Sequence, residues 1–128
     1  MSTVPEEFKY SAEHEWIGTT DDALVVRVGI TDFAQDALGE VVYVEHPEVG
    51  STVTSGDVVG EVESTKSVSD IFAPVGGEIV AVNTELDENP GAVNSAPYGA
   101  GWLFEIKLAE TSAVDSLLSA EDYKKQVG

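Results

Sequence analysis

Short segments that combine apolar with polar residues recur along the chain and are separated by polar turns. Most are only four to eight residues long and rich in Val and Ile, which favours β-strands over helices. Many short strands joined by tight turns are typical of all-β sandwiches and barrels, so the pattern predicts a mainly β domain decorated by short helices. Strands are expected over residues 14–17, 23–30, 40–45, 57–64, 67–73, 78–83 and 102–108.

Helix signals occur at two places. Thr31 and Asp32 form a capping residue and an acidic first turn, and Gly39 can take the backbone conformation that ends a helix, which predicts about two helical turns. Serines followed three residues later by aspartate predict short helical turns in a C-terminal segment, residues 110–128. The opposite end, residues 1–9, carries acids and a proline and is expected to be an N-terminal tail.

The chain is expected to form a single domain over residues 1–128, because this length is common for one domain and no linker interrupts it. Residues 87–101 show no periodicity and contain several prolines and glycines. A loop of that length is uncommon in a small domain and is usually functional or mobile.

The charge is strongly unbalanced. The chain has 24 acidic residues and 6 Lys or Arg, for a net charge of −18 and a pI near 4.1. Such a surface repels phosphate backbones and anionic lipid, so neither nucleic acid nor a membrane is an expected partner. Cysteine is absent, which excludes disulfides, thiol nucleophiles and zinc–thiolate sites. No apolar run exceeds four residues, so neither a membrane span nor a signal peptide is expected.

Little catalytic chemistry is available. The two histidines are His14 and His46, and no metal-binding or nucleophile motif accompanies them. His46 precedes Pro47 and is interpreted as a solvated turn residue. His14 precedes Glu15, and an imidazole beside a carboxylate can be functional, so this pair stays a candidate. The inventory predicts no catalytic residue and no metal site.

Lys66 is the unusual residue. It is the one Lys or Arg between Arg27 and Lys107, and it shares a tight turn with Thr65 between two predicted strands. Two-residue hairpin turns usually require positive φ, which the β-branched Thr65 adopts poorly, so a strained turn is expected. One interpretation is that Lys66 only balances local acid; the other is that an exposed, flexible amine is presented for covalent modification.

The strand register under this turn follows from its length. With a two-residue loop, Glu63 faces Val68 and Glu61 faces Asp70, which places like charges opposite each other. An acidic collar beneath the lone lysine is therefore expected.

The segment that carries these residues, GEVESTKSVSD at 60–70, resembles the lipoylation hairpin of the glycine cleavage H-protein family, and Pro74 and Gly77 continue the pattern. The resemblance covers about residues 6–125. His46 is one departure, because Leu is frequent there in the family. Further similar blocks are HEW at 14–16, GITD at 29–32, LGEVV at 38–42, PYG at 97–99 and GWL at 101–103.

The resemblance implies a lipoyl-type barrel-sandwich hybrid of two antiparallel sheets with short peripheral and C-terminal helices. It implies a non-catalytic carrier with lipoic acid in amide linkage on Lys66. The carrier would take an aminomethyl group from a pyridoxal-phosphate glycine decarboxylase to a tetrahydrofolate-dependent aminomethyltransferase. It would pass electrons to dihydrolipoamide dehydrogenase. Lipoate-attaching enzymes are the remaining implied partners.

In this family the loaded arm folds back into a surface cleft. Glu15 and Asp70 are predicted to line that cleft and to hold the cationic cargo by charge-assisted hydrogen bonds, with His14 as a further candidate. Glu63, three residues before Lys66, is a candidate for recognition by the lipoate-attaching enzyme, or it only shapes the hairpin.

Two rival functions stay open. The chain could relay lipoate to other enzymes without glycine cleavage, or it could be a small enzyme that uses His14 and Glu15. We expect a monomer in the bacterial cytoplasm, with a mitochondrial matrix as the less favoured location, because the start shows no Arg-rich transit segment.

Overall fold

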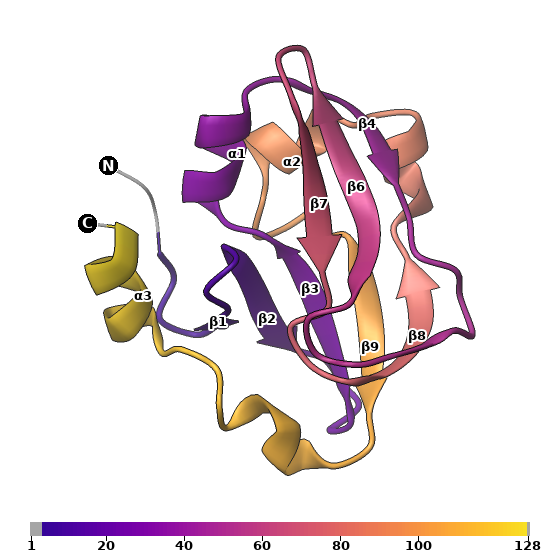
Figure 1. Ribbon diagram of the computed structural model, residues 1–128, viewed down its shortest axis with the longest axis vertical. Helices are drawn as coiled ribbons and strands as arrows, with labels where there is room; N and C mark the ends of the chain where they lie inside the picture. Colours follow the sequence, from indigo (N-terminus) through magenta and orange to yellow (C-terminus); the bar gives the residue numbers. More distant parts are fainter. Residues whose placement is uncertain (1–3, 128) are drawn as a thin grey trace.

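The structure is a computed structural model that describes residues 4–127. Its strands form two antiparallel sheets, one in the order β1-β2-β3-β9-β8-β5 and one in the order β4-β6-β7 (Figure 1). The strands are β1 (Lys9–Tyr10), β2 (Glu15–Thr19), β3 (Val25–Ile30), β4 (Val41–Glu45), β5 (Thr52–Val53), β6 (Val58–Ser64), β7 (Val68–Phe72), β8 (Gly77–Val82) and β9 (Phe104–Leu108). The helices are α1 (Asp32–Leu38), η1 (Thr84–Asp87), α2 (Ala92–Ser95), η2 (Thr111–Val114) and α3 (Ala120–Val127).

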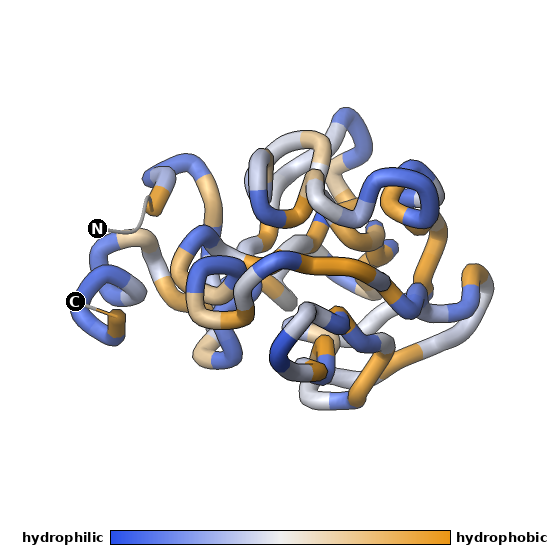
Figure 2. Tube along the Cα trace, turned by 90° about the horizontal axis from the view of Figure 1, so that it is seen from above, coloured by the Kyte–Doolittle hydropathy of each residue, from blue (hydrophilic) through white to orange (hydrophobic). Residues whose placement is uncertain are grey.

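The hydrophobic core lies between the two sheets. Val28, Ile79 and Ile106 of the larger sheet are fully buried, and they belong to one cluster with Val62 and Ile71 of the smaller sheet. Alternate residues of two central strands face this core: Val26, Val28 and Ile30 on β3, and Phe104, Ile106 and Leu108 on β9. Figure 2 shows the hydrophilic colour on many of the bends at the periphery of the molecule.

Helix α1 begins and ends as predicted. The Thr31 side-chain oxygen accepts a hydrogen bond from the Ala34 N–H at 3.2 Å, which caps the first turn. At the other end Gly39 has φ 89°, and its N–H donates to the Gln35 carbonyl. The helix therefore stops at the residue that can leave the helical conformation, and it covers one open side between the sheets (Figure 1).

The segment 87–101 differs from the loop expected for it, because it contains the short helix α2. The Asn94 side chain on α2 accepts from the Val41 N–H and donates to the Gly39 carbonyl, each at 2.8 Å. These bonds satisfy backbone groups between α1 and β4, so the segment is pinned to the helix beside it rather than free.

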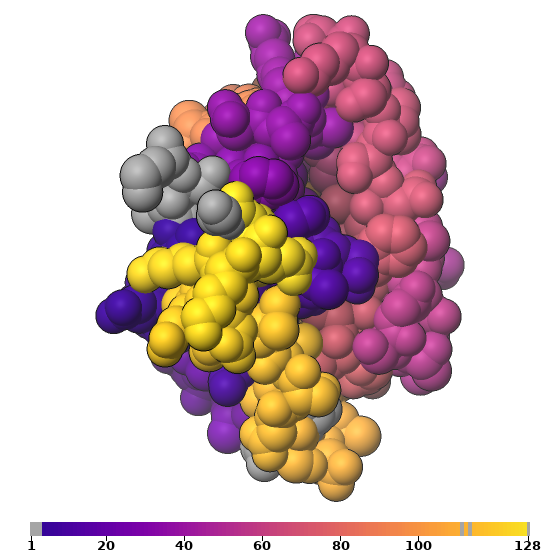
Figure 3. Space-filling model, turned by 60° about the vertical axis from the view of Figure 1, so that its left-hand side comes forward, coloured from indigo at the N-terminus to yellow at the C-terminus, as the bar shows by residue number. Residues whose placement is uncertain are grey.

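The chain ends pack against the larger sheet. Residues 4–9, expected to form a tail, instead pack onto the domain: Val4 is buried, and the Phe8 ring stacks on Trp16 with centroids 4.7 Å apart. Residues 1–3 of that predicted tail lie outside the described residues. The space-filling view shows α3, in yellow, against the indigo N-terminal part of the chain (Figure 3).

The expected helical turns of the C-terminal segment are present as η2 and α3, and residue 128 lies outside the described part of the chain. The Asp122 N–H donates to Ser119 Oγ at 3.2 Å, which is the predicted cap of α3. Within residues 4–127, no helix combines the length and the apolar character needed to cross a bilayer.

Candidate functional site

The turn that carries Lys66 is held by one serine hydroxyl. Ser64 Oγ accepts from the Ser67 N–H at 3.1 Å and from the Lys66 N–H at 3.3 Å, and it donates to the Ser67 carbonyl at 3.1 Å. The expectation of a strained turn is wrong, because His14 is the one non-glycine residue with positive φ in residues 4–127. The Ser64 hydroxyl satisfies the turn's backbone groups, so Thr65 can keep negative φ.

Lys66 stands exposed at the tip of the β6–β7 hairpin. Its stem passes over the end of α1, since a Cβ built on Gly39 would lie 3.2 Å from Lys66 Cε. The neighbouring Thr65 N–H donates to the Glu40 carbonyl at 3.0 Å, which ties the tip to the chain that follows α1. Among the described residues, no carboxylate lies within ion-pair distance of the Lys66 amine. The backbone that carries Lys66 is therefore held by hydrogen bonds, while the Lys66 amine is uncommitted in the sense that it forms no ion pair with a described residue.

Carboxylates form a row across the smaller sheet below this tip. The hairpin register is as predicted, with Glu61 opposite Asp70 and Glu63 opposite Val68, and Glu45 on β4 extends the row on the other side of Glu61. Partial burial and then the hydrogen bond and charge of Glu45 raise the pKa of the Glu61 carboxyl. This part of the sheet is therefore strongly negative and corresponds to the acidic collar predicted beneath Lys66.

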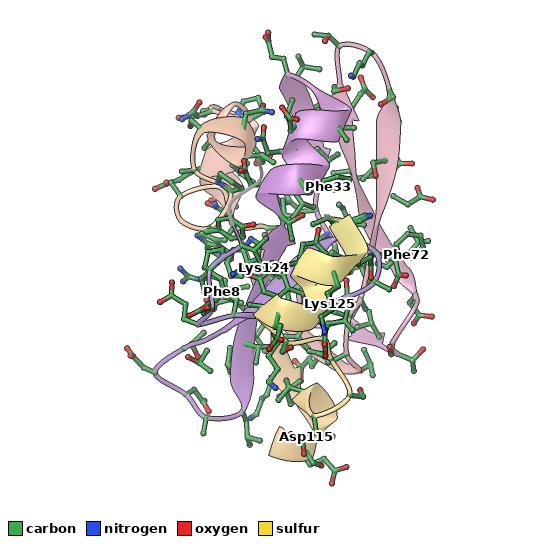
Figure 4. All side chains as sticks on the ribbon, turned by 90° about the vertical axis from the view of Figure 1, so that its left-hand side faces the viewer. Phe8, Phe33, Phe72, Asp115, Lys124 and Lys125 are labelled. Carbon is green, nitrogen blue, oxygen red and sulfur yellow. The ribbon has the colours of Figure 1, made fainter. Side chains whose placement is uncertain are left out.

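A cleft of about 380 Å³ lies between α1 and β7. Figure 4 labels Phe33 on α1 and Phe72 on β7, the two elements that bound it. The end nearer the hairpin tip is lined by Ala37 and Ser67, and the far end is lined by residues that precede β2 and begin it. The apolar lining includes Ile30, Phe33, Ala34, Leu38, Val62 and Ile71.

Glu15 closes the far end of the cleft as a buried acid. It is 1% exposed, and its two carboxyl oxygens accept from Ser11 Oγ at 3.0 Å and from the Phe72 N–H at 2.8 Å. Burial raises the pKa of this carboxyl to about 8, although both hydrogen bonds lower it. A carboxyl in this state becomes more acidic when a cation enters the cleft, because an opposite charge favours the ionised form.

His14 forms the corner beside Glu15. Its φ is 68°, its ring lies 4.9 Å from the Phe33 ring, and its Nδ1 is 2.8 Å from the hydroxyl of Tyr123. Burial lowers the pKa of the imidazole. A non-glycine residue in this backbone region persists only when its surroundings hold it, and such residues cluster at functional sites.

The structure brings most of the predicted site residues together. His14, Glu15 and Asp70 line the same cleft, and Lys66 lies beside the end nearer the hairpin tip. Glu63 is exposed and lies outside the lining.

The sequence does not single out Ser11 or Tyr123, although both bond to the cleft residues. Ser11 precedes Glu15 across an irregular turn, and Tyr123 is separated from His14 by 109 positions. The four-residue spacing of Ser11 and Glu15 spans a turn and not a helix, and Tyr123 is far from His14 in sequence, so no local pattern could have indicated either contact.

Known proteins share both the sequence and the shape of this chain. The family described as "Glycine cleavage H-protein" matches residues 8–128. The "Glycine cleavage system H protein" of Micrococcus luteus is 67% identical over 123 residues, 96% of each chain, and that of Kocuria rhizophila is 58% identical over 125 residues, 98% of each. The crystal structure of a glycine cleavage system H protein from Mycobacterium marinum matches with a TM-score of 0.88 and 47% identity, covering 98% of this chain and 99% of that one. The predicted fold of two antiparallel sheets with short helices is confirmed by this likeness.

Proposed function

Because this chain belongs to the glycine cleavage H-protein family, which is the family of lipoyl carriers, we propose that Lys66 bears lipoic acid in amide linkage. The observation that carries the proposal is the uncommitted Lys66 amine, exposed at a rigid hairpin tip directly beside a cleft. An attaching enzyme can reach an amine in this position, while the hydrogen-bonded strands below it keep the base of the arm fixed.

The cleft suits a lipoyl arm that folds back along α1. Its walls are mostly apolar, which matches a hydrocarbon chain, and it runs beside a helix of seven residues that rises roughly 10 Å. An arm that starts over Gly39 therefore has an apolar path toward Glu15, and the polar groups are concentrated where the arm would end.

When attached, the lipoyl group supplies a dithiolane that accepts an aminomethyl cargo and two electrons. The residues of this chain then have separate tasks. Ser64 fixes the turn under the arm, the α1 wall excludes water from the cleft, and Glu15 and Asp70 hold the cationic amine of the cargo. Glu15 begins largely protonated at neutral pH and would release its proton to solvent when the ammonium group arrives, so the pair forms without a permanently buried charge.

The proposal extends to partners and location. The carrier takes the aminomethyl group from glycine decarboxylase to aminomethyltransferase and returns electrons through dihydrolipoamide dehydrogenase, as a monomer in the bacterial cytoplasm. The net charge of −18 supports docking on basic faces of these enzymes, since electrostatic steering speeds encounter without tight binding. Glu63 sits on the exposed face beside Lys66, where an attaching enzyme could read it.

An enzyme built on His14 and Glu15 is not favoured by the geometry. The Glu15 carboxyl bonds to Ser11 and to the Phe72 N–H, whereas His14 Nδ1 lies against Tyr123. The two groups thus have other partners and do not form an acid–base pair.

The first test is the mass of the chain and of its Lys66 peptide after expression in a host supplied with lipoate. We expect one lipoyl increment on Lys66, and none in Lys66→Arg, which keeps the charge but removes the acceptor amine. Glu63→Gln should reduce the modified fraction if Glu63 is read by the attaching enzyme. An unmodified Lys66 in the presence of an active attaching enzyme would overturn the carrier proposal.

The second test concerns the cleft. Chains loaded with the aminomethyl cargo should release it faster in the double variant Glu15→Gln, Asp70→Asn than in the unmutated chain, because the charge-assisted hydrogen bonds are lost. Glu48→Gln, on an exposed loop, is the matched control. An unchanged cargo lifetime in the double variant would remove the roles of Glu15 and Asp70.

A further inference from the structure

The hydroxyl of Tyr123 joins two parts of the molecule that meet at the far end of the cleft. Tyr123 lies on α3 and is fully buried. Its oxygen is 2.8 Å from His14 Nδ1 and 2.7 Å from Thr31 Oγ1. Buried polar groups cost free energy unless they are paired, and here one hydroxyl serves two partners at once.

Each of the two partners shapes one side of the cleft. His14 lines the cleft directly, immediately before the buried Glu15, and holds a backbone conformation that is rare outside glycine. Thr31 caps α1 through the Ala34 N–H, and α1 forms the facing wall. The carbonyl of His14 also accepts from the Thr31 N–H at 3.0 Å, so the two parts meet through backbone as well.

Helix α3 is itself fixed to the domain at the same place. The Tyr123 ring stacks on Tyr10 with centroids 4.7 Å apart, and the Gln126 side chain donates to the Ala12 carbonyl at 2.9 Å. The backbone of Tyr10 pairs with Leu118, just before α3. The position of the Tyr123 hydroxyl is therefore set from outside the cleft by the C-terminal segment.

From this geometry we propose that Tyr123 is a positioning residue, which holds His14 and the start of α1 in register and so fixes the shape of the Glu15 end of the cleft. It does not touch the arm or the cargo. The effect of Tyr123 on cargo retention rests on the carrier function proposed above. The coupling of His14 to Thr31 through the Tyr123 hydroxyl is independent of that function.

The test compares Tyr123→Phe with Tyr10→Phe. Both substitutions remove one hydroxyl from a stacked, fully buried ring, but the Tyr10 hydroxyl donates to the Pro5 carbonyl, away from the cleft. The first readouts use the unmodified chain: the ¹⁵N shifts of the His14 imidazole, and hydrogen exchange of the Ala34 amide relative to the Ile106 amide in the core.

We expect Tyr123→Phe to shift the His14 ring signals and to speed exchange at Ala34 about tenfold over Ile106, the change that corresponds to one lost buried hydrogen bond. We expect Tyr10→Phe to change neither, even if it lowers overall stability. Normalising to Ile106 separates a local opening from global unfolding. If Tyr123→Phe leaves both readouts like those of Tyr10→Phe, the coupling is refuted.

The functional half is tested on the loaded chain. Tyr123→Phe should shorten the lifetime of the bound cargo while leaving the mass increment on Lys66 unchanged. A normal lifetime together with altered His14 and Ala34 signals would overturn the claim that this coupling shapes the cargo end. Failure of Lys66 to be modified would instead overturn the carrier proposal and leave the coupling to be judged by the unmodified chain.

Discussion

Replacing Glu15 by glutamine should make the protein more stable at neutral and alkaline pH. The side-chain amide of the Glu15→Gln variant can keep both hydrogen bonds, with its oxygen accepting from the Phe72 N–H and its N–H donating to Ser11, so the change removes the ionisable group and little else. Burial raises the pKa of Glu15 from 4.5 to about 8. The folded chain therefore holds a proton that the unfolded chain releases, and stability must fall as pH rises through this window.

The loss of unfolding free energy depends on the difference between the pKa values of Glu15 in the folded and unfolded chains. One unit of pKa difference corresponds to about 1.4 kcal/mol. Between pH 5.5 and 7.5 the unmutated chain should lose about 2 to 3 kcal/mol of unfolding free energy that the Glu15→Gln variant retains. General repulsion among the surface acids acts equally on both chains and cancels in the difference.

Urea denaturation followed by tryptophan fluorescence can measure this difference, because Trp16 is buried in the folded chain. Unfolding curves at pH 5.5 and 7.5 give the four free energies needed. Glu48→Gln, which removes an exposed carboxyl, should follow the unmutated chain at both pH values. If Glu15→Gln and the unmutated chain changed in parallel with pH, burial of this carboxyl would not be destabilising and its proposed response to a cation would fail.

Three further predictions follow from other contacts. Asn94→Ala should lower the unfolding free energy by about 2 kcal/mol, because the Val41 N–H and the Gly39 carbonyl lose their partner; an unchanged urea midpoint would show that water replaces the amide. His46 is not the solvated turn residue interpreted from the sequence, because its Nδ1 is buried and no described residue hydrogen-bonds it, while its contact with Asp87 is solvent-exposed. His46→Leu should therefore raise the unfolding free energy by about 1 kcal/mol and with it the thermal midpoint, and a lower midpoint would contradict this. Cargo transfer rates with the partner enzymes should fall as salt rises, and a flat dependence in stopped-flow assays would indicate apolar docking.

The features predicted correctly from sequence are those set by short-range rules. The hairpin register at Glu61 and Asp70 follows from turn length and the alternation of strand residues. The start and end of α1 follow from the capping side chain of Thr31 and the backbone freedom of Gly39. Glu15 and Asp70 line one cleft in the structure, a placement that the family resemblance implies and no local pattern gives, and their role toward a bound arm stays a prediction.

The features that the sequence does not indicate depend on contacts between distant segments. The rare backbone conformation of His14 is held by its surroundings, including Tyr123 at the other end of the chain. Turn statistics predict strain at Thr65 because they do not include the Ser64 hydroxyl that stabilises this particular turn. Strands β1 and β5 have two residues each, too few for a periodic signal.

Strand β7 is an edge strand, and its position affects the solubility of the protein. Its outer row of backbone groups has no partner strand in the part of the chain that the structure describes, although the Phe72 N–H at its end donates to Glu15. At the other end, beside the tip, Val68 is 55% exposed. Open edges with apolar side chains pair readily with another copy unless charge opposes it. That opposition weakens as pH approaches the pI of 4.1, so solubility should reach its minimum there and association should begin at this strand. The exposed hairpin that presents Lys66 to other proteins also exposes part of β7. Electrostatic repulsion between copies is therefore needed to keep the protein in solution.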